Sequence, residues 1–485
     1  MKRTPLSLLV CVLAIPACQS ESQRVSPTSI PAGWSCTLLS PIQGPLDISL
    51  PPFACVADVR VVAGDRGRVG VTWRRAVDRD TLQWDATIGR FRVRDSDMTL
   101  EQSRYPFPRS GIPAFDERKR PPLDHEAFAQ HEFVAMAVVG PQGVEGRGFF
   151  AGYPPDCSWA DPMQDVCYAD GRWYAVFNLY RPKGAPESGC DIALVGFDAS
   201  GWSEPIVVVP NEASHAIWCF SERTRIDLFW ADYYLPFLAM PDSGLERQHL
   251  KHTRFAPGEK GRIETVYTSP QMRLFGFGSD DQIVRPLRIT ADRYDLLTER
   301  HFTGLFHLVG VPPPKSELFH LVNVRSAWAA TAGPLARYYS FRDCVALVLP
   351  DGRVQLVWDE EPERDPVSGR PTSEGYRIME VHYDGRSWSS PREAARTSRI
   401  GRYGLTGALI RAGGRSAVLV AWQDEHGHLA CMVGSGSGQW SGPITTNLAV
   451  GECIWVAAHE ANLTLVTQID RNLHWCRLSI TSQAD

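Results

Sequence analysis

One turn-and-strand segment recurs along this chain, and this repeat restricts the fold more than any other feature of the sequence. In its clear copies a turn rich in Gly, Asp and Arg precedes an apolar stretch that ends in Trp or Phe. These copies span residues 64–73, 170–177, 223–230, 351–358 and 413–422, and weaker copies span 292–299 and 462–468. Apolar side chains alternate within them, as at Ile226, Leu228 and Trp230, which is the period of a β-strand with one packed face. Repeats at such intervals indicate a propeller or a solenoid.

A second element follows the first in three places, at residues 190–205, 376–391 and 428–443. Each copy reads as a strand, a hairpin turn that contains Gly, and the motif Trp-Ser-x-Pro at the start of a further strand. Together the two elements predict the second, third and fourth strands of a four-stranded blade. Long helical patterns are missing from the sequence, which favours an all-β fold.

The hairpins at 198–202 and 384–388, Asp-Ala-Ser-Gly-Trp and Asp-Gly-Arg-Ser-Trp, resemble the Asp-box repeats of the sialidase-like propellers. That family places an Asp and a Gly in the hairpin just before a Trp, although the full Ser-x-Asp-x-Gly-x-x-Trp box is absent here. The resemblance covers most of residues 55–480 and implies a β-propeller. Counting the first element gives about seven four-stranded blades. Six or eight blades are the alternatives, because a further strand-like pair, 131–139 and 146–153, lies between the first two copies.

The two ends of the domain predict how the ring closes. The last repeat ends with a third strand at 471–480, and the segment 33–39, Gly-Trp-Ser-Cys-Thr-Leu-Leu, resembles the missing fourth strand. We expect this N-terminal strand to be the outer strand of the last blade, which would remove an exposed sheet edge. The closure would bring Cys36 near Cys476 or Cys453, where a disulfide could form. The alternative is that the likeness arose by chance.

The N-terminal segment indicates export from the cytoplasm. A basic start is followed by an apolar run from Leu6 to Ile15, which is too short to span a bilayer but suits a signal peptide over residues 1–17. The residues before Cys18 resemble a bacterial lipoprotein signal, which implies that Cys18 carries a lipid. Pro16 departs from that pattern and leaves secretion without a lipid as the alternative.

The rest of the chain divides into a tether and one domain. Residues 18–32 are polar and without periodicity, which predicts a flexible tether behind the lipid anchor. Residues 33–485 predict a single propeller domain. The resemblance to lipoproteins implies attachment to the cell envelope, and Gln19 after the lipidated cysteine implies an outer-membrane or periplasm-facing address.

Composition narrows the partners and the compartment. The formal charge is −5 at pH 7 and the basic residues are spread along the chain, so a nucleic-acid interface is not supported. Of the 12 cysteines, Cys11 leaves with the signal and Cys18 would carry the lipid, and the even remainder predicts up to five disulfides or, alternatively, some buried thiols. The nearest approach to a metal motif is His426-Gly-His428, which is weak alone, so we expect no metal. We also expect no cofactor, and we expect the protein to be a monomer.

The candidate functional residues lie in loops. In a propeller the loops between strands two and three, and those between blades, gather on one face around the axis, where ligands bind. Histidine, tyrosine and arginine side chains could act as a base or neutralise a carboxylate. The candidate catalytic residues are His215, Tyr234, Arg300, His301 and Arg402. The candidate ligand-binding residues are Arg74, Asp232, Glu360, Asp424, His426, Arg337 and Tyr403. For each of them a solvated loop charge is the alternative.

These residues favour recognition of a glycan over a named reaction. Sialidase-like enzymes bind the carboxylate of their sugar with arginines, but the Phe/Tyr-Arg-Ile-Pro motif of that family is absent from this sequence. We therefore expect an exported lipoprotein that binds an extracellular glycan or glycoconjugate at its axial face. The alternatives are a glycoside hydrolase or polysaccharide lyase, and a platform for protein interactions in the cell envelope.

Overall fold

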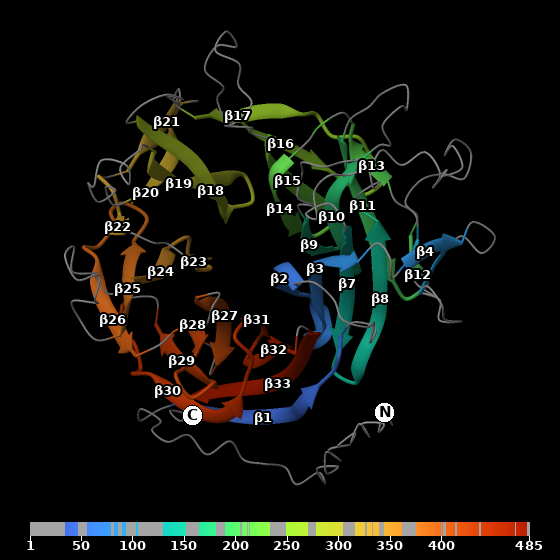
Figure 1. Cartoon of the computed structure of the whole chain (residues 1–485). Helices are drawn as coiled ribbons and strands as arrows, with labels where there is room; N and C mark the ends of the chain where they lie inside the picture. Colours follow the sequence, from blue (N-terminus) through green and yellow to red (C-terminus); the bar gives the residue numbers. More distant parts are fainter. Residues whose placement is uncertain are drawn as a thin grey trace, which may run out of the picture.

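The computed structural model of this chain contains a ring of antiparallel sheets (Figure 1). The described residues are 34–46, 56–78, 82–85, 90–93, 103–104, 130–151, 164–180, 190–203, 206–210, 212, 214–232, 249–269, 278–303, 316–324, 327–331, 333–338, 344–360, 375–398, 400, 404–412, 415–435, 438–470 and 472–482. Seven of the sheets are blades, so the expected seven-bladed all-β propeller is confirmed. Within these ranges no helix is long and apolar enough to cross a membrane.

The strands of each blade follow one another outward from the axis. Blades 1 to 3 contain β2 (Val56–Ala63), β3 (Val69–Asp78), β7 (Gln130–Gly140) and β8 (Gly143–Ala151); β9 (Gln164–Ala169), β10 (Arg172–Tyr180), β11 (Cys190–Asp198) and β12 (Gly201–Trp202) with β13 (Ile206–Val209); and β14 (Ser214–Glu222), β15 (Arg225–Asp232), β16 (His249–Phe255) and β17 (Glu264–Thr268).

The same order continues in the second half of the ring. Blades 4 to 7 contain β18 (Gly278–Thr290), β19 (Arg293–Thr303), β20 (Ser316–Val324) and β21 (Ala327–Ala330) with β22 (Ala336–Tyr338); β23 (Cys344–Val348), β24 (Val354–Glu360), β25 (Tyr376–Tyr383) and β26 (Arg392–Thr397); β27 (Thr406–Ala412), β28 (Arg415–Gln423), β29 (His428–Gly434) and β30 (Ile444–Ala449); and β31 (Ile454–His459), β32 (Asn462–Ile469), β33 (Asn472–Ser482) and β1 (Trp34–Gln43).

The long interval between the first two repeats adds no blade. Its strand-like pair forms β7 and β8, the third and fourth strands of blade 1, so the alternatives of six or eight blades are wrong. The interval also holds β4 (Leu82–Asp85) and β5 (Arg90–Val93), which pair with each other, and β6 (Ser103–Arg104), which runs parallel to β8.

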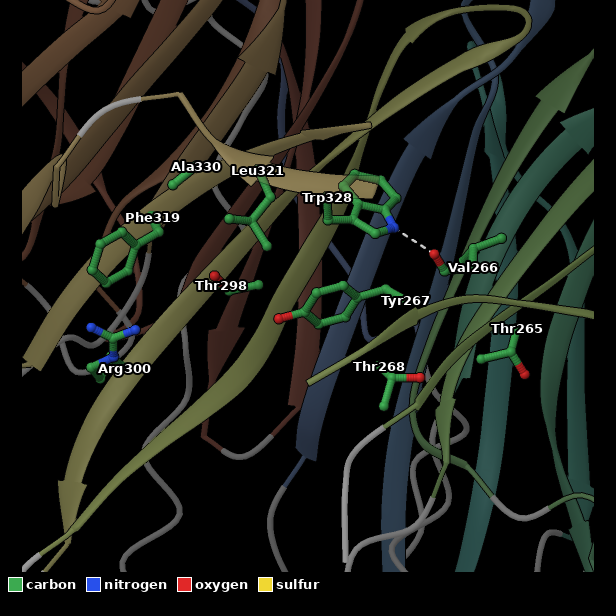
Figure 2. Close-up of a pocket in the computed structure, with 10 residues that line it drawn as sticks. All are labelled: Thr265, Val266, Tyr267, Thr268, Thr298, Arg300, Phe319, Leu321, Trp328 and Ala330. Carbon is green, nitrogen blue, oxygen red and sulfur yellow. Dashed lines mark hydrogen bonds between the residues drawn. The ribbon is translucent and has the colours of Figure 1, made fainter. Parts of the chain in front are cut away.

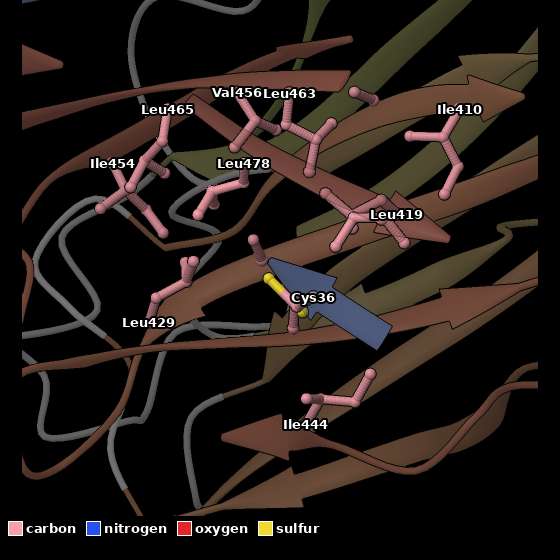
Figure 3. Packing of buried hydrophobic residues seen from close by; sticks show 14 of the residues in the cluster. Cys36, Ile410, Leu419, Leu429, Ile444, Ile454, Val456, Leu463, Leu465 and Leu478 are labelled. Atoms are coloured by element: carbon pink, nitrogen blue, oxygen red, sulfur yellow. The ribbon is translucent and has the colours of Figure 1, made fainter. Parts of the chain in front are cut away.

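The N-terminal strand closes the ring, as the sequence predicts. β1 pairs antiparallel with β33, with Trp34 opposite Ser482 and Leu38 opposite Leu478. No disulfide is present at this closure, since Cys36 and both of its expected partners, Cys476 and Cys453, are free thiols. Cys36 and Cys476 lie in one apolar cluster between blades 6 and 7, of which Figure 3 shows the surroundings of Cys36. Burial raises the pKa of Cys36 to about 11 and that of Cys476 to about 12, so neither thiol ionises readily.

The recurring Trp residues hold neighbouring blades together. Trp73, Trp230, Trp358 and Trp422 end the apolar stretch of the second strand in their blades and are at most 1% exposed. A Trp after the hairpin between strands three and four reaches back instead, since Trp202 Nε1 donates to Arg147 O of the preceding blade at 2.8 Å. The repeat therefore encodes contacts between blades as well as strands.

The hairpins that resemble Asp boxes are shaped by their aspartates. Asp384 Oδ1 accepts hydrogen bonds from the backbone N–H groups of Arg386 and Ser387, both at 2.8 Å. Gly385 has φ of 96°, a conformation that favours glycine. Asp198 accepts in the same way from Ser200 N at 2.7 Å.

Antiparallel pairing gives the ring two different faces. The turns between strands one and two and between strands three and four lie on one side, which we call the turn face; it carries residues 170–171, 223–224, 291–292 and 384–387. The connections between strands two and three and between successive blades lie on the other side, which we call the loop face. Each innermost strand begins at the loop face.

Candidate functional site

Three charged residues from three blades gather around the axis. Arg60 lies on β2, Asp165 on β9 and Arg285 on β18, and all three strands are the innermost of their blades. Burial raises the pKa of Asp165, and the charges of Arg60 and Arg285 act in the opposite direction. The three groups are therefore close enough to influence one another, and we call them the axial charge cluster.

The carboxylate of Asp165 has a structural role. Its Oδ1 accepts a hydrogen bond from Val166 N and its Oδ2 one from Cys219 N, both at 2.8 Å. Because Cys219 belongs to β14, these bonds join blade 2 to blade 3. With both oxygens held by backbone amides, Asp165 moderates the positive charge at the axis without clamping either guanidinium.

The two arginines keep a surplus of positive charge. Burial and the charge of Arg60 both lower the pKa of Arg285. Arg285 Nε is shielded from solvent and makes no hydrogen bond to any part of the chain that the structure describes. Arg60, in contrast, is exposed to solvent. An anion that approached Arg60 would therefore also meet the field of Arg285.

Both arginines follow an irregularity in their strand. The β2–β3 register shifts between Ala57 and Arg60, and Asp58 has φ of 52°. The β18–β19 register shifts between Ile283 and Arg285. Bulges of this kind re-aim side chains and are common beside functional sites.

The predicted ligand-binding residue Arg74 lies beside this cluster. Its Nε is 3.3 Å from Asp58 Oδ2, and Gln164 Nε2 donates to Asp58 O at 3.0 Å. Asp58 is two residues from Arg60, and Gln164 directly precedes Asp165. The structure thus places Arg74 at the edge of the axial charge cluster.

Arg300 and Arg337 come together through a shared carboxylate. Arg337 Nε donates to Glu317 Oε1 at 2.9 Å, and an Arg300 guanidinium nitrogen is 3.9 Å from Glu317 Oε2. The Arg300 guanidinium also lies 4.8 Å from the centroid of the Phe319 ring. Figure 2 shows Arg300 at one end of a cavity of about 530 Å³ between blades 3 and 4, with Tyr267 and Trp328 at its centre.

Glu360, Asp424 and His426 occupy other blades. Glu360 Oε2 accepts from an Arg377 guanidinium nitrogen at 2.6 Å, an ion pair between the second and third strands of blade 5. Asp424 Oδ1 accepts from His426 N at 2.9 Å and thereby shapes its own turn. The His426 side chain is exposed and lies 3.8 Å from Glu425. Asp424 and His426 also line a cavity of about 550 Å³ between blades 5 and 6.

The remaining predictions are not tested. Tyr234, Arg402, Tyr403 and Cys18, together with the signal peptide and the tether, lie outside the described residues. His215, Asp232 and His301 lie in β14, β15 and β19, but their side chains are outside the described set.

The sequence-based candidates were chosen from loops, whereas the axial charge cluster lies on strands. Its arginines stand inside apolar strands, in Val59-Arg60-Val61 and in Ile283-Val284-Arg285. An arginine within an innermost strand was the available signal. It could be read only once the strands were assigned to their places in a blade.

Comparison with known proteins adds no closer identification. No protein-family model matches the sequence, and no curated protein matches it. Solved structures with some likeness include Trypanosoma rangeli sialidase, at 8% identity and a TM-score of 0.36 over 66% of this chain and 54% of that chain. AofleA from Arthrobotrys oligospora has 11% identity and a TM-score of 0.34 over 67% of this chain and 86% of that chain. The Bombyx mori GH32 beta-fructofuranosidase has 13% identity and a TM-score of 0.30 over 66% of this chain and 62% of that chain. This chain thus spans about half the length of the sialidase. At such TM-scores the propeller assignment rests on the strand order alone.

Proposed function

We propose that this protein binds an anionic glycan or glycoconjugate at its axis, through Arg60 and Arg285. One observation carries the proposal: among the described residues, the charges of Arg60 and Arg285 meet at the axis the carboxylate of Asp165, and backbone amides already hold both oxygens of that carboxylate. Asp165 is the second residue of β9, which begins at the loop face, so the ligand would enter from that face.

The chemistry of guanidinium suits an acidic sugar. Its planar fork donates two parallel hydrogen bonds to a carboxylate or a sulfate, which gives both orientation and affinity. The shielded Arg285 would interact more strongly than an exposed arginine, because the local dielectric constant is lower. A bound anion would also relieve the repulsion between the two arginines.

Export and anchoring complete the proposal. The sequence of residues 1–18 supports cleavage before Cys18 and lipidation of that cysteine, which would present the propeller to glycans outside the cytoplasm. Labelling of cells with a radioactive fatty acid tests this step. We expect label in the wild-type protein and none in Cys18→Ser, whereas equal labelling of both would contradict it.

The binding proposal is tested on protein purified from cells that express the full chain. Uronate-containing, sulfated and neutral oligosaccharides are compared for binding and for release of products. We expect the acidic ligands to bind, and Arg285→Met or Arg60→Met to weaken them at least about tenfold, the loss of a charge-assisted hydrogen bond. The matched control is Arg386→Met, an exposed arginine in a hairpin of the turn face.

Three results would point elsewhere. Unchanged affinity for the acidic ligands in both arginine variants would contradict the proposal. Release of reducing or unsaturated ends would establish the glycoside hydrolase or lyase alternative. Silence with every glycan would favour the protein-interaction alternative.

A further inference from the structure

Blades 3 and 4 contain the same buried pair of side chains. Asp227 and Asp295 occupy equivalent positions in the second strands, and both are 0% exposed. In the third strands His252 pairs with Phe229 and His320 with the equivalent Leu297. Each histidine Nε2 meets its aspartate, at 3.0 Å in blade 3 and 3.2 Å in blade 4. The two pairs can therefore be compared residue by residue.

The blade 4 pair is sealed by blade 5. Trp388 Nε1 donates to His320 Nδ1 at 3.1 Å, which leaves Nε2 as the nitrogen that donates to Asp295. The Tyr383 ring covers the same histidine, with the ring centroids 5.2 Å apart. His320 has no side-chain exposure at all. At this seam the pair is part of the core.

The blade 3 pair is left open by blade 4. In blade 4, Asn323 on the third strand lies opposite Trp328. In blade 5, Tyr383 on the third strand lies opposite Trp388 in the same way, so Asn323 is the equivalent of Tyr383. Trp328 Nε1 donates to Val266 O and not to the histidine. A cavity of about 610 Å³ lies here, on the turn-face side of Trp328. It is separate from the axial charge cluster.

The open cavity has apolar walls and paired charges. Phe229 stacks on His252 with ring centroids 4.4 Å apart, and Tyr294 lies 4.7 Å from Phe229. Arg254 Nε donates to Asp227 at 2.6 Å, and another of its nitrogens donates to Asp292 at 2.9 Å. Arg262, Arg293 and Glu264 also line the cavity, so charges of both signs surround it and neither sign dominates.

The mouth of the cavity carries planar polar groups. His252 Nδ1 is 3.1 Å from Glu264 Oε1, and the Glu264 side chain is 56% exposed. Carboxylate and guanidinium groups at such a mouth accept from and donate to neighbouring hydroxyls, while aromatic walls pack against C–H faces. We propose that this cavity binds an uncharged sugar residue. Its volume lies within the usual range of small-molecule sites.

The test copies a residue of the closed seam between blades 4 and 5 into the open seam between blades 3 and 4. Asn323→Tyr would place in the open seam the side chain that covers His320 in the next blade. Asn323 is exposed, so the fold should tolerate the change. Glu393→Gln, at an exposed ion pair of blade 5, is the matched control.

The readout is saturation-transfer NMR on the full-chain protein. The probes are free glucose, galactose, mannose and N-acetylglucosamine, with glucuronic acid as the acidic comparison. We expect transfer to at least one neutral sugar, a reduction of at least about fivefold in Asn323→Tyr, and no change in Glu393→Gln or in the axial variant Arg285→Met.

Several outcomes would overturn the inference. No transfer to any neutral sugar would do so, and so would transfer that Asn323→Tyr leaves intact. Transfer to glucuronic acid alone would contradict the uncharged ligand. Loss of transfer in Arg285→Met would assign the signal to the axis. Circular dichroism of each variant shows that the fold is kept.

Discussion

Two seams of the ring each contain a buried aspartate paired with a histidine. The seam between blades 3 and 4 is open, whereas the seam between blades 4 and 5 is closed. His252 retains 12% of its side-chain exposure, whereas His320 has none. The difference follows from the covering residues, Asn323 in one case and Tyr383 in the other. The strand pairing is thus the same in both blades. The side chains that lie between neighbouring blades determine whether the seam is packed or holds a cavity.

Loss of the histidine should separate the two seams most strongly. We expect His320→Ala to lower the free energy of unfolding by about 3 kcal/mol, because it opens a cavity in a packed seam and leaves the Trp388 N–H buried without its partner, while Asp295 keeps its ion pair with Arg293. His252→Ala should cost about 1 kcal/mol, because water in the cavity can replace the imidazole. Urea denaturation of both variants measures the difference, and equal losses would show that the seams do not differ.

Exchange of the covering residues comes next in size. Tyr383→Asn should lower the free energy of unfolding by about 2 kcal/mol, since it opens a packed seam around His320. Asn323→Tyr should stay within about 1 kcal/mol of the wild-type protein, because it fills existing space. The same urea titrations apply. If Asn323→Tyr were the costlier change, the cavity would not be vacant space.

Access to the two rings should differ by a smaller factor. Exchange of the histidine C2 hydrogen with deuterium, followed by mass spectrometry, reports how often solvent reaches each imidazole. We expect His252 to exchange about tenfold faster than His320, because the latter exchanges only when its seam opens. Similar rates for the two rings would mean that both seams open equally often.

The exposed carboxylate of the open seam should matter least for stability. Glu264→Gln is expected to change the free energy of unfolding by no more than about 0.5 kcal/mol, because its carboxylate is solvated and screened. Denaturation at low and high salt checks this. A loss comparable to that of His320→Ala would make Glu264 part of the core network.

Strand periodicity was sufficient to predict the propeller, its blade number and its closure. The turn-and-strand repeat ends in Trp73, Trp230, Trp358 or Trp422 because that side chain packs between blades, so the physical demand and the visible pattern coincide. The Gly-Trp-Ser likeness identified β1 because the outer strand of every blade meets the same environment. Such signals are local in the sequence.

The sites were only partly predictable, because they arise between blades. Arg74, whose predicted role in binding stays a prediction, lies beside the axial charge cluster, but Arg60 and Arg285 come from blades that are far apart in the sequence. Their proximity depends on ring closure, which no local pattern encodes. Arg300 and Arg337 were predicted separately, and the carboxylate that joins them, Glu317, was not. The expected Cys36 disulfide failed because strand register places Cys36 opposite Ile480.

In the proposed site, Arg60 and Arg285 hold an anion at the axis, beside the carboxylate of Asp165. Isothermal titration of a uronate oligosaccharide into the wild-type protein and into Arg285→Met tests it most directly, at low and at high salt. The account predicts an affinity at least about tenfold lower in Arg285→Met and a weaker dependence of the remaining affinity on salt. Equal affinities and equal salt dependence in the two proteins would contradict it.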